Sequence, residues 1–98
     1  MSQKPRLGCL HAHHSNIGYI EDIIPHDALE AVHFFEPGLL RRIGSDATFS
    51  PEDASDQVRK QLDWMTACGV DAVLITCTNY IAAMPDEATR HDIPIIKI

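Results

Sequence analysis

The chain has 98 residues, of which 45% are hydrophobic, so it is long enough for one small domain with its own core. Its formal net charge of −6 and its scattered Lys and Arg residues argue against a nucleic-acid or anionic-membrane partner. The apolar runs are far shorter than the roughly 20 residues that a membrane-spanning helix needs. Three cysteines without a CxxC spacing, and a start without a signal-peptide core, indicate a reducing cytoplasm.

The first part of the chain predicts two strands with a helix between them. A short apolar strand is expected over residues 7–11, followed by the polar and small residues HHSNIG. Ser15 is a suitable cap for a helix that runs to about Ile24, where Pro25 stops it. Residues 31–35 (AVHFF) predict the second strand.

The clearest element of the sequence is a helix that begins after Ser50. Residues 39–43 predict a short helix or turn before it, followed by a loop at residues 44–48. A proline and two acidic residues follow Ser50, as is typical of a capped helix start, and Gly69 is a typical residue just past a helix end. Apolar residues at helical spacing mark the buried face: Ala54, Val58, Leu62 and Met65. Trp64 is expected at the edge of this stripe or at a domain contact.

The last third of the chain predicts two further strands and indicates the fold class. Residues 71–76 (DAVLIT) show no polar alternation, as expected for a strand covered on both faces in a parallel sheet. A helix should follow to about Arg90, and residues 93–98 (IPIIKI) predict the fourth strand. The order β-α-β-α-β-α-β specifies an α/β fold, a single four-stranded parallel sheet with helices on both faces.

One thiol, Cys77, directly follows the third predicted strand. Ligands of α/β proteins bind beyond the carboxyl ends of the strands. Thr78 and Asn79 are suitable caps for the next helix, so nearby amides could bind an anion and stabilise a thiolate. The alternative is that Cys77 is a small buried hydrophobe, as most free cysteines are. The other two cysteines, Cys9 and Cys68, are expected to serve packing.

The C-terminal third carries a resemblance to a known family. The segment GVDAVLITCTNYIAAM, followed by IPIIKI, resembles the end of the first domain of the aspartate/glutamate racemase superfamily. That superfamily also includes hydantoin racemases, maleate isomerases and arylmalonate decarboxylases. In it, a comparable strand delivers a cysteine followed by Asn and Thr, which here stand transposed as Thr78 and Asn79. The resemblance implies the flavodoxin-like half of a two-domain racemase-type fold.

The resemblance also implies a chemistry, which is proton removal next to a carboxylate without a cofactor. Cys77 matches the first-domain cysteine that acts as acid or base, and the substrate would be a small carboxylate or an amino acid. The developing enediolate needs hydrogen-bond donors that are already in place. The candidate substrate-binding residues are polar and lie near strand ends: Ser15, Asn16, Thr78, Asn79 and His11. Helix capping is the plain alternative for the first four.

Family members have two similar domains, so residues 1–98 are expected to be the N-terminal domain of a longer two-domain protein. A second thiol would come from the missing second domain, or from the partner in a homodimer. The isolated chain should then have little racemase activity. The expected function is a domain of a cofactor-independent amino-acid racemase. The alternatives are a related decarboxylase or maleate isomerase, or a non-catalytic α/β domain that binds a small carboxylate metabolite.

A dense group of possible metal ligands lies near the start of the chain. On a strand, Cys9, His11 and His13 would point the same way, and a His-x-His pair at a strand end can bind zinc. A complete site needs a further ligand, for which His33 and Asp22 are only loosely placed. We therefore expect no metal, and we interpret the HAHH segment as polar loop residues that shape an anion pocket.

Overall fold

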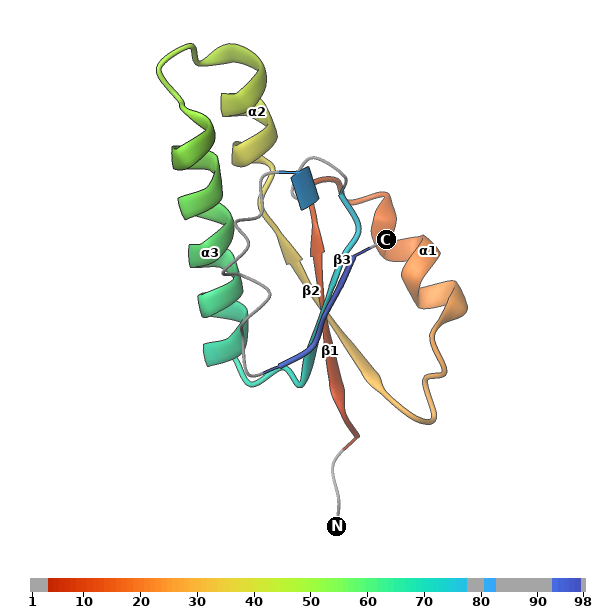
Figure 1. Ribbon diagram of the computed structural model, residues 1–98. Helices are drawn as coiled ribbons and strands as arrows, with labels where there is room; N and C mark the ends of the chain where they lie inside the picture. The colour runs from red at the N-terminus through yellow and green to blue at the C-terminus, as the bar shows by residue number, and fades with distance from the viewer. Residues whose placement is uncertain (1–3, 78–80, 83–92, 98) are drawn as a thin grey trace.

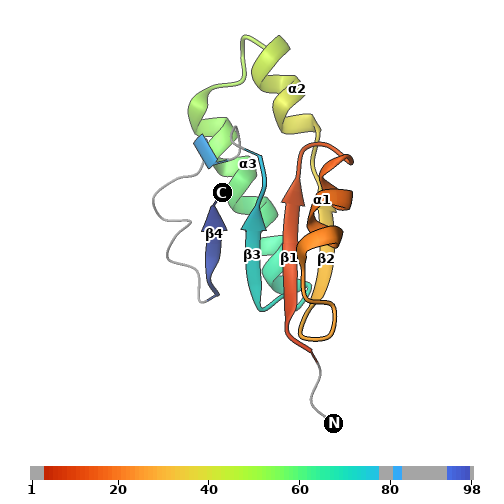
Figure 2. The ribbon, with the colours of Figure 1, turned by 90° about the vertical axis from the view of Figure 1, so that its right-hand side faces the viewer.

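The computed structural model describes residues 4–77, 81–82 and 93–97. These residues form a four-stranded parallel sheet with helices on both faces, as predicted (Figure 1). The elements follow one another as β1 (Arg6–His11), α1 (Asn16–Ile23), β2 (Glu30–Phe35), α2 (Gly38–Ser45), α3 (Pro51–Ala67), β3 (Ala72–Ile75) and β4 (Ile95–Lys97). Helices α2 and α3 lie on one side of the sheet and α1 lies on the other (Figures 1 and 2).

Strand β1 lies inside the sheet although it is the first strand of the chain. The strand order is β2-β1-β3-β4, so β1 has a neighbour on each side (Figure 2). Leu10 of β1 pairs with Phe34 of β2 and with Ile75 of β3. Because all these pairs are parallel, the carboxyl ends of the three strands lie at one edge of the sheet.

The two faces of the sheet differ in chemistry, since successive side chains of a strand point to opposite faces. The face under α2 and α3 is apolar and belongs to the hydrophobic core. The buried members of this core are Leu10, Leu39, Ala54, Val58, Leu62, Met65, Val70, Val73 and Ile75. The face under α1 instead carries Cys9, His11 and His33, and Ile20 is the buried residue that α1 itself contributes.

Helix α3 forms where the sequence predicts it. The Ser50 side chain accepts a hydrogen bond from the amide of Asp53, and the Asp53 carboxylate accepts one from the amide of Ser50, both at 3.0 Å. Gly69 follows the helix with φ of 88°, in the left-handed region that favours glycine. Met65 is fully buried and Trp64 is 63% exposed, so Trp64 lies outside the buried stripe.

Several element boundaries differ from the prediction. Strands β1 and β2 each begin one residue earlier than predicted, at Arg6 and Glu30. Helix α2 extends to Ser45, into the loop expected at residues 44–48, and the amide of Asp46 still donates to the carbonyl of Arg42 at 2.9 Å in the helical pattern. Strand β3 is one residue shorter at each end than predicted. Strand β4 begins two residues later than predicted, directly after Pro94, which has no amide hydrogen to donate.

Most of the helix expected between Cys77 and Arg90 lies outside the described residues. Within that helix the structure describes Ile81 and Ala82, and both are helical. In the part of the chain that the structure describes, no helix has the length and apolar character needed to cross a membrane.

Candidate functional site

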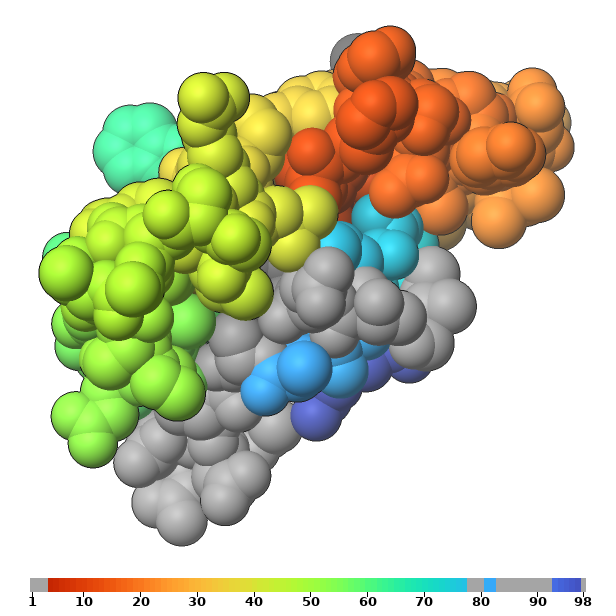
Figure 3. Space-filling view, turned by 90° about the horizontal axis from the view of Figure 1, so that it is seen from above, coloured from red at the N-terminus to blue at the C-terminus, as the bar shows by residue number. Residues whose placement is uncertain are grey.

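The candidate site lies at the carboxyl edge of the sheet, where β1 and β3 end beside each other. His11 is the last residue of β1, and Thr76 and Cys77 directly follow β3. The amide of Thr76 donates to the carbonyl of Leu10 at 3.2 Å, which continues the pairing beyond the end of β3. Figure 3 looks onto this edge, and the end of β3 (cyan) reaches the surface beside the segment that follows β1 (red to orange).

Cys77 occupies the edge of the sheet that the sequence predicts for a functional thiol. It is half-buried and packs against the hydrophobic core. Its carbonyl accepts a hydrogen bond from the amide of Ile81 at 3.2 Å, the spacing that an α-helix uses. Thr78 and Asn79, the predicted anion donors, lie outside the described residues.

His11 is completely buried, and both of its ring nitrogens have a partner. Its Nδ1 lies 2.8 Å from Thr76 Oγ1, and its Nε2 lies 2.8 Å from His33 Nδ1. Burial, followed by the effect of His33, lowers the pKa of His11 to about 4, so the ring is neutral at pH 7. His11 was predicted to contact substrate, and the structure connects it to the edge of the sheet through Thr76.

Five polar side chains form one continuous series of hydrogen bonds, which we call the polar chain. At one end, His33 Nε2 lies 2.7 Å from Glu21 Oε1 on α1. At the other end, the side-chain amide of Asn16, also on α1, donates to Thr76 Oγ1 at 3.2 Å. The polar chain therefore runs from Glu21 through His33, His11 and Thr76 to Asn16, and it satisfies groups that burial would otherwise leave without partners.

The register of β1 and β2 brings the two histidines and a cysteine together. Cys9 pairs with His33, and His11 lies two residues further along the same face of β1. One ligand atom from each of Cys9, His11 and His33 lies within 4.8 Å of the other two. Burial, followed by the charge of Glu21, raises the pKa of Cys9 to about 11, so the thiol is protonated at neutral pH. Its complete burial agrees with the packing role predicted for it.

Ser15 and the two exposed histidines lie apart from the polar chain. Ser15 occupies the N-cap position of α1, but its side chain makes no capping hydrogen bond, and Ser15 Oγ instead lies 2.8 Å from Nδ1 of His13. His13 and His14 are exposed, with ring centroids 4.4 Å apart. Because β1 ends at His11, His13 does not continue the face shared by Cys9 and His11. The prediction that these three side chains point the same way was wrong for His13.

Sequence reasoning missed part of the polar chain. Thr76 and Glu21 were not predicted as site residues, and His33 was only a loosely placed ligand. Thr76 ends an apolar run just before Cys77, and His33 interrupts the apolar run AVHFF. A polar residue in a buried strand needs a hydrogen-bond partner, so the sequence already indicated that both side chains take part in polar contacts. Glu21 carried no such signal, and its exposed neighbour Asp22 was considered in its place.

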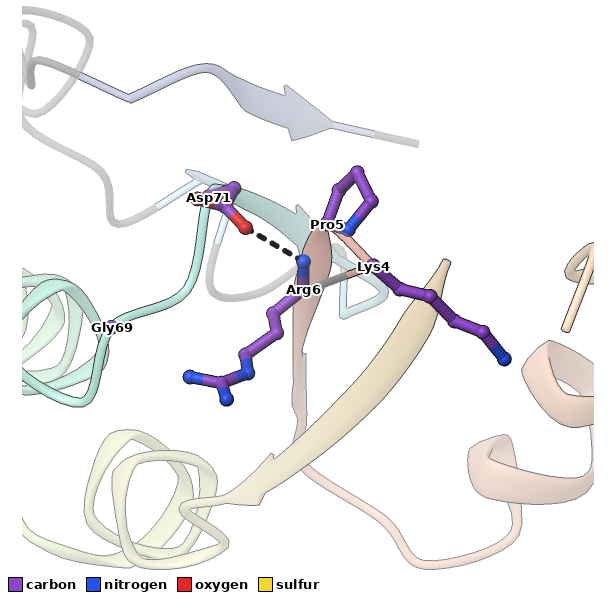
Figure 4. Close-up of a pocket in the computed structure, with 5 residues that line it drawn as sticks. All are labelled: Lys4, Pro5, Arg6, Gly69 and Asp71. Atoms are coloured by element: carbon purple, nitrogen blue, oxygen red, sulfur yellow. Dashed lines mark hydrogen bonds between the residues drawn. The ribbon is translucent and has the colours of Figure 1, made fainter. Parts of the chain in front are cut away.

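A separate cavity lies at the opposite, amino edge of the sheet (Figure 4). It has a volume of about 460 Å³ and is lined by Lys4, Pro5, Arg6, Gly69 and Asp71. The amide of Arg6 donates to the Asp71 carboxylate at 2.8 Å, which ties the start of β1 to the residue before β3. Cys68, next to Gly69, is exposed, so the prediction that it serves packing was wrong.

No protein-family model matches the chain, and no curated protein matches it either. The resemblance to the racemase superfamily therefore stays a prediction from the residues around Cys77.

Proposed function

We propose that the chain is a domain of a cofactor-independent racemase, in which Cys77 exchanges a proton with the carbon next to a carboxylate. The position of Cys77 carries the proposal. It is a half-buried thiol two residues after the end of β3, an interior strand of a parallel sheet, at the edge where α/β proteins bind ligands. The resemblance of the segment around Cys77 to the first racemase domain points to the same residue.

The proposed reaction removes and returns one proton. The Cys77 thiolate takes the proton from the carbon, and the electron pair of the broken C–H bond moves into the carboxylate to give an enediolate. A second thiol returns a proton to the opposite face of the carbon. In this proposal the second thiol belongs to a second domain or to a second copy of the chain. A small carboxylate or an amino acid is the substrate, and a related decarboxylase or maleate isomerase would use the same half-site.

The residues around Cys77 supply donors for the carboxylate. Asn16 uses one side-chain N–H for Thr76, and the amide group carries a second N–H that can bind a substrate oxygen. Ser15, Thr78 and Asn79 remain proposed substrate contacts. The neutral His11 holds the Thr76 hydroxyl in place, so these donors need little rearrangement when negative charge develops.

The alkylation rates of the three cysteines test this proposal within one protein. Cys68 is exposed, Cys77 is half-buried and Cys9 is buried, so accessibility alone predicts that Cys68 reacts fastest. A thiol at a functional site should instead react fastest at Cys77, because the thiolate is the reactive form. We expect iodoacetamide labelling, followed residue by residue by mass spectrometry across pH, to show Cys77 ahead of Cys68. Small dicarboxylates or amino acids should slow Cys77 and leave Cys68 unchanged.

The two alternatives give different patterns in this experiment. A Cys77 that reacts more slowly than Cys68, yet is protected by a carboxylate, would indicate the non-catalytic binding domain. A slow and unprotected Cys77 would contradict both functions. Replacing Cys68 with serine checks that labelling at Cys77 does not depend on the other accessible thiol.

A further inference from the structure

We propose that Cys9, His11 and His33 bind a zinc-type divalent cation beneath α1, with Glu21 and Thr76 orienting the two imidazoles. This site is separate from the thiol of Cys77 and does not depend on the proposed racemase function. It departs from the expectation that the chain holds no metal, because the third ligand comes from β2 and not from His13.

The three ligand atoms have the chemistry and the spacing of a metal site. One thiol sulfur and two imidazole nitrogens suit zinc, and three protein ligands leave a fourth position for water or another group. Tetrahedral zinc separates two histidine nitrogens by about 3.3 Å, and a nitrogen from a sulfur by about 3.5 Å. The facing nitrogens of His11 and His33 are now 2.8 Å apart, and the three atoms lie within 4.8 Å. An opening of about half an ångström between the rings, together with an approach of the Cys9 sulfur from within 4.8 Å to about 3.5 Å of the two nitrogens, would admit the ion.

The outer partners of both imidazoles are already in place. A zinc-binding histidine usually gives its other ring nitrogen to a carboxylate, a carbonyl or another acceptor, which fixes its tautomer and orientation. His33 has Glu21 Oε1 at 2.7 Å from Nε2, and His11 has Thr76 Oγ1 at 2.8 Å from Nδ1. The nitrogens that face each other, Nε2 of His11 and Nδ1 of His33, are therefore the ones left to bind an ion.

The hydrogen positions permit this arrangement. A carboxylate only accepts, so His33 Nε2 carries a hydrogen toward Glu21. The Thr76 hydroxyl lies 3.2 Å from the carbonyl of Leu10, and when it donates there, it accepts from Nδ1–H of His11. Two lone pairs, on His11 Nε2 and His33 Nδ1, then face each other at 2.8 Å. A cation between them removes that repulsion, whereas the metal-free protein must place a proton there.

The charges around the site also balance. A divalent ion carries two positive charges, the Cys9 thiolate would carry one negative charge, and the Glu21 carboxylate carries another. Cys9 and His11 are fully buried, and a buried charge is costly unless it is compensated nearby. The bound site would therefore be neutral as a whole.

Cobalt and zinc titrations of the metal-free chain test the proposal. We expect one equivalent of Co²⁺ to bind, with a sulfur-to-cobalt charge-transfer band and the intense visible bands of a four-coordinate ion, and Zn²⁺ to displace it. Cys9→Ser should abolish the charge-transfer band, and Cys68→Ser, which removes an exposed thiol elsewhere, should retain it. Glu21→Ala should weaken zinc binding by about 10- to 100-fold although Glu21 is no ligand.

Other results would overturn the proposal. These are the absence of a charge-transfer band, a band that survives Cys9→Ser, and a band that disappears when the exposed His13 and His14 are both replaced by asparagine. If Cys9→Ser does not fold, Glu21→Ala decides, because Glu21 is partly exposed and unchanged zinc affinity in that variant would also overturn the proposal. Labelling of Cys77 is a separate readout, so failure of the metal site and failure of the proposed function can be distinguished.

Discussion

Thr76 is the residue through which the buried histidines meet the edge of the sheet. Its Oγ1 lies 2.8 Å from Nδ1 of His11 and 3.2 Å from both the side-chain amide of Asn16 and the carbonyl of Leu10. The next residue is Cys77, so the hydroxyl helps to fix where the chain leaves β3. A single oxygen therefore links α1, β1 and the backbone that carries the candidate thiol.

Replacing Thr76 with valine should destabilise the fold. Valine keeps the size and the branched shape of the side chain but leaves His11 and Asn16 without their partner. An unsatisfied buried polar group costs about 1–3 kcal/mol, and we expect a decrease of that size in the free energy of unfolding in urea. Thr66→Val is the matched control, because Thr66 is exposed and bonds within α3, and its change should stay within about 0.5 kcal/mol. Equal losses in the two variants would contradict a stabilising role for the polar chain.

At the scale of single elements, the two hydrogen bonds between Ser50 and Asp53 at the start of α3 make the stability of the protein depend on pH. Hydrogen bonds from the backbone and then the side chain of Ser50 lower the pKa of Asp53 below its usual 3.8. The folded state thus favours the carboxylate, and the unfolded state takes up the proton at a higher pH. The stability that this pair contributes is present above the usual pKa and is lost as the pH falls through the lowered one.

Asp53→Asn should therefore make the free energy of unfolding depend less on pH in the acidic range. Urea unfolding from about pH 5 down to about pH 2 should show a smaller loss of stability in the variant than in the parent chain. Some pH dependence should remain, because hydrogen bonds with Thr48 and then Arg42 also lower the pKa of Asp46. Asp46→Asn, combined with the first change, should reduce that remainder. Superimposable profiles for the parent and Asp53→Asn would refute the argument.

Elements with local signals were predicted well, and contacts between elements were not. The start of α3 after Ser50 and its end before Gly69 depend on residues in the helix or directly beside it, so the sequence was sufficient. The end of β1 at His11 was also predicted correctly. The interpretation of a metal site instead assumed that the strand continues to His13, but β1 pairs with β2 only as far as His11 and Phe35. Glu21 was missed for a related reason, since the helix face that meets the sheet is a tertiary property.

At the scale of the whole molecule, the α3 layer lies very close to the sheet at one point. A Cβ added to Gly8 of β1 would lie 2.9 Å from Cε of Met65 and 3.0 Å from Cγ1 of Val70. The end of the methionine side chain can move, but Val70 is stiff and buried, so it cannot move away easily. The absence of a side chain at Gly8 is therefore part of how the two layers fit.

Two glycine substitutions test this description of the layers. Gly8→Ala should destabilise the protein by about 1–3 kcal/mol, because the added methyl group overpacks the contact with α3. Gly18→Ala should stabilise it by about 0.5–1 kcal/mol, since Gly18 lies inside α1 with nothing within 4 Å of the added atom. The comparison is made by chemical unfolding of both variants. A neutral or stabilising Gly8→Ala would mean that α3 does not lie this close to β1.

The order of elements was enough to predict the layered architecture, because strands that alternate with helices form a parallel sheet with covered faces. It was not enough to predict that one layer interface is apolar and that the other combines apolar side chains with Cys9, His11 and His33. That difference depends on which strand positions face α1, and therefore on the register among β1, β2 and β3.

The interior position of β1 has a consequence for how the chain folds during synthesis. The ribosome releases β1 first, but both of its neighbours are made later, and the second is complete only after Ile75 has emerged. Until then one edge of β1 has unpaired amides and carbonyls, which can pair with other chains. A nascent chain that pauses before this point also lacks Thr76, which joins the histidines to Asn16. Both edges of β1 can therefore be paired only after β3 has been made.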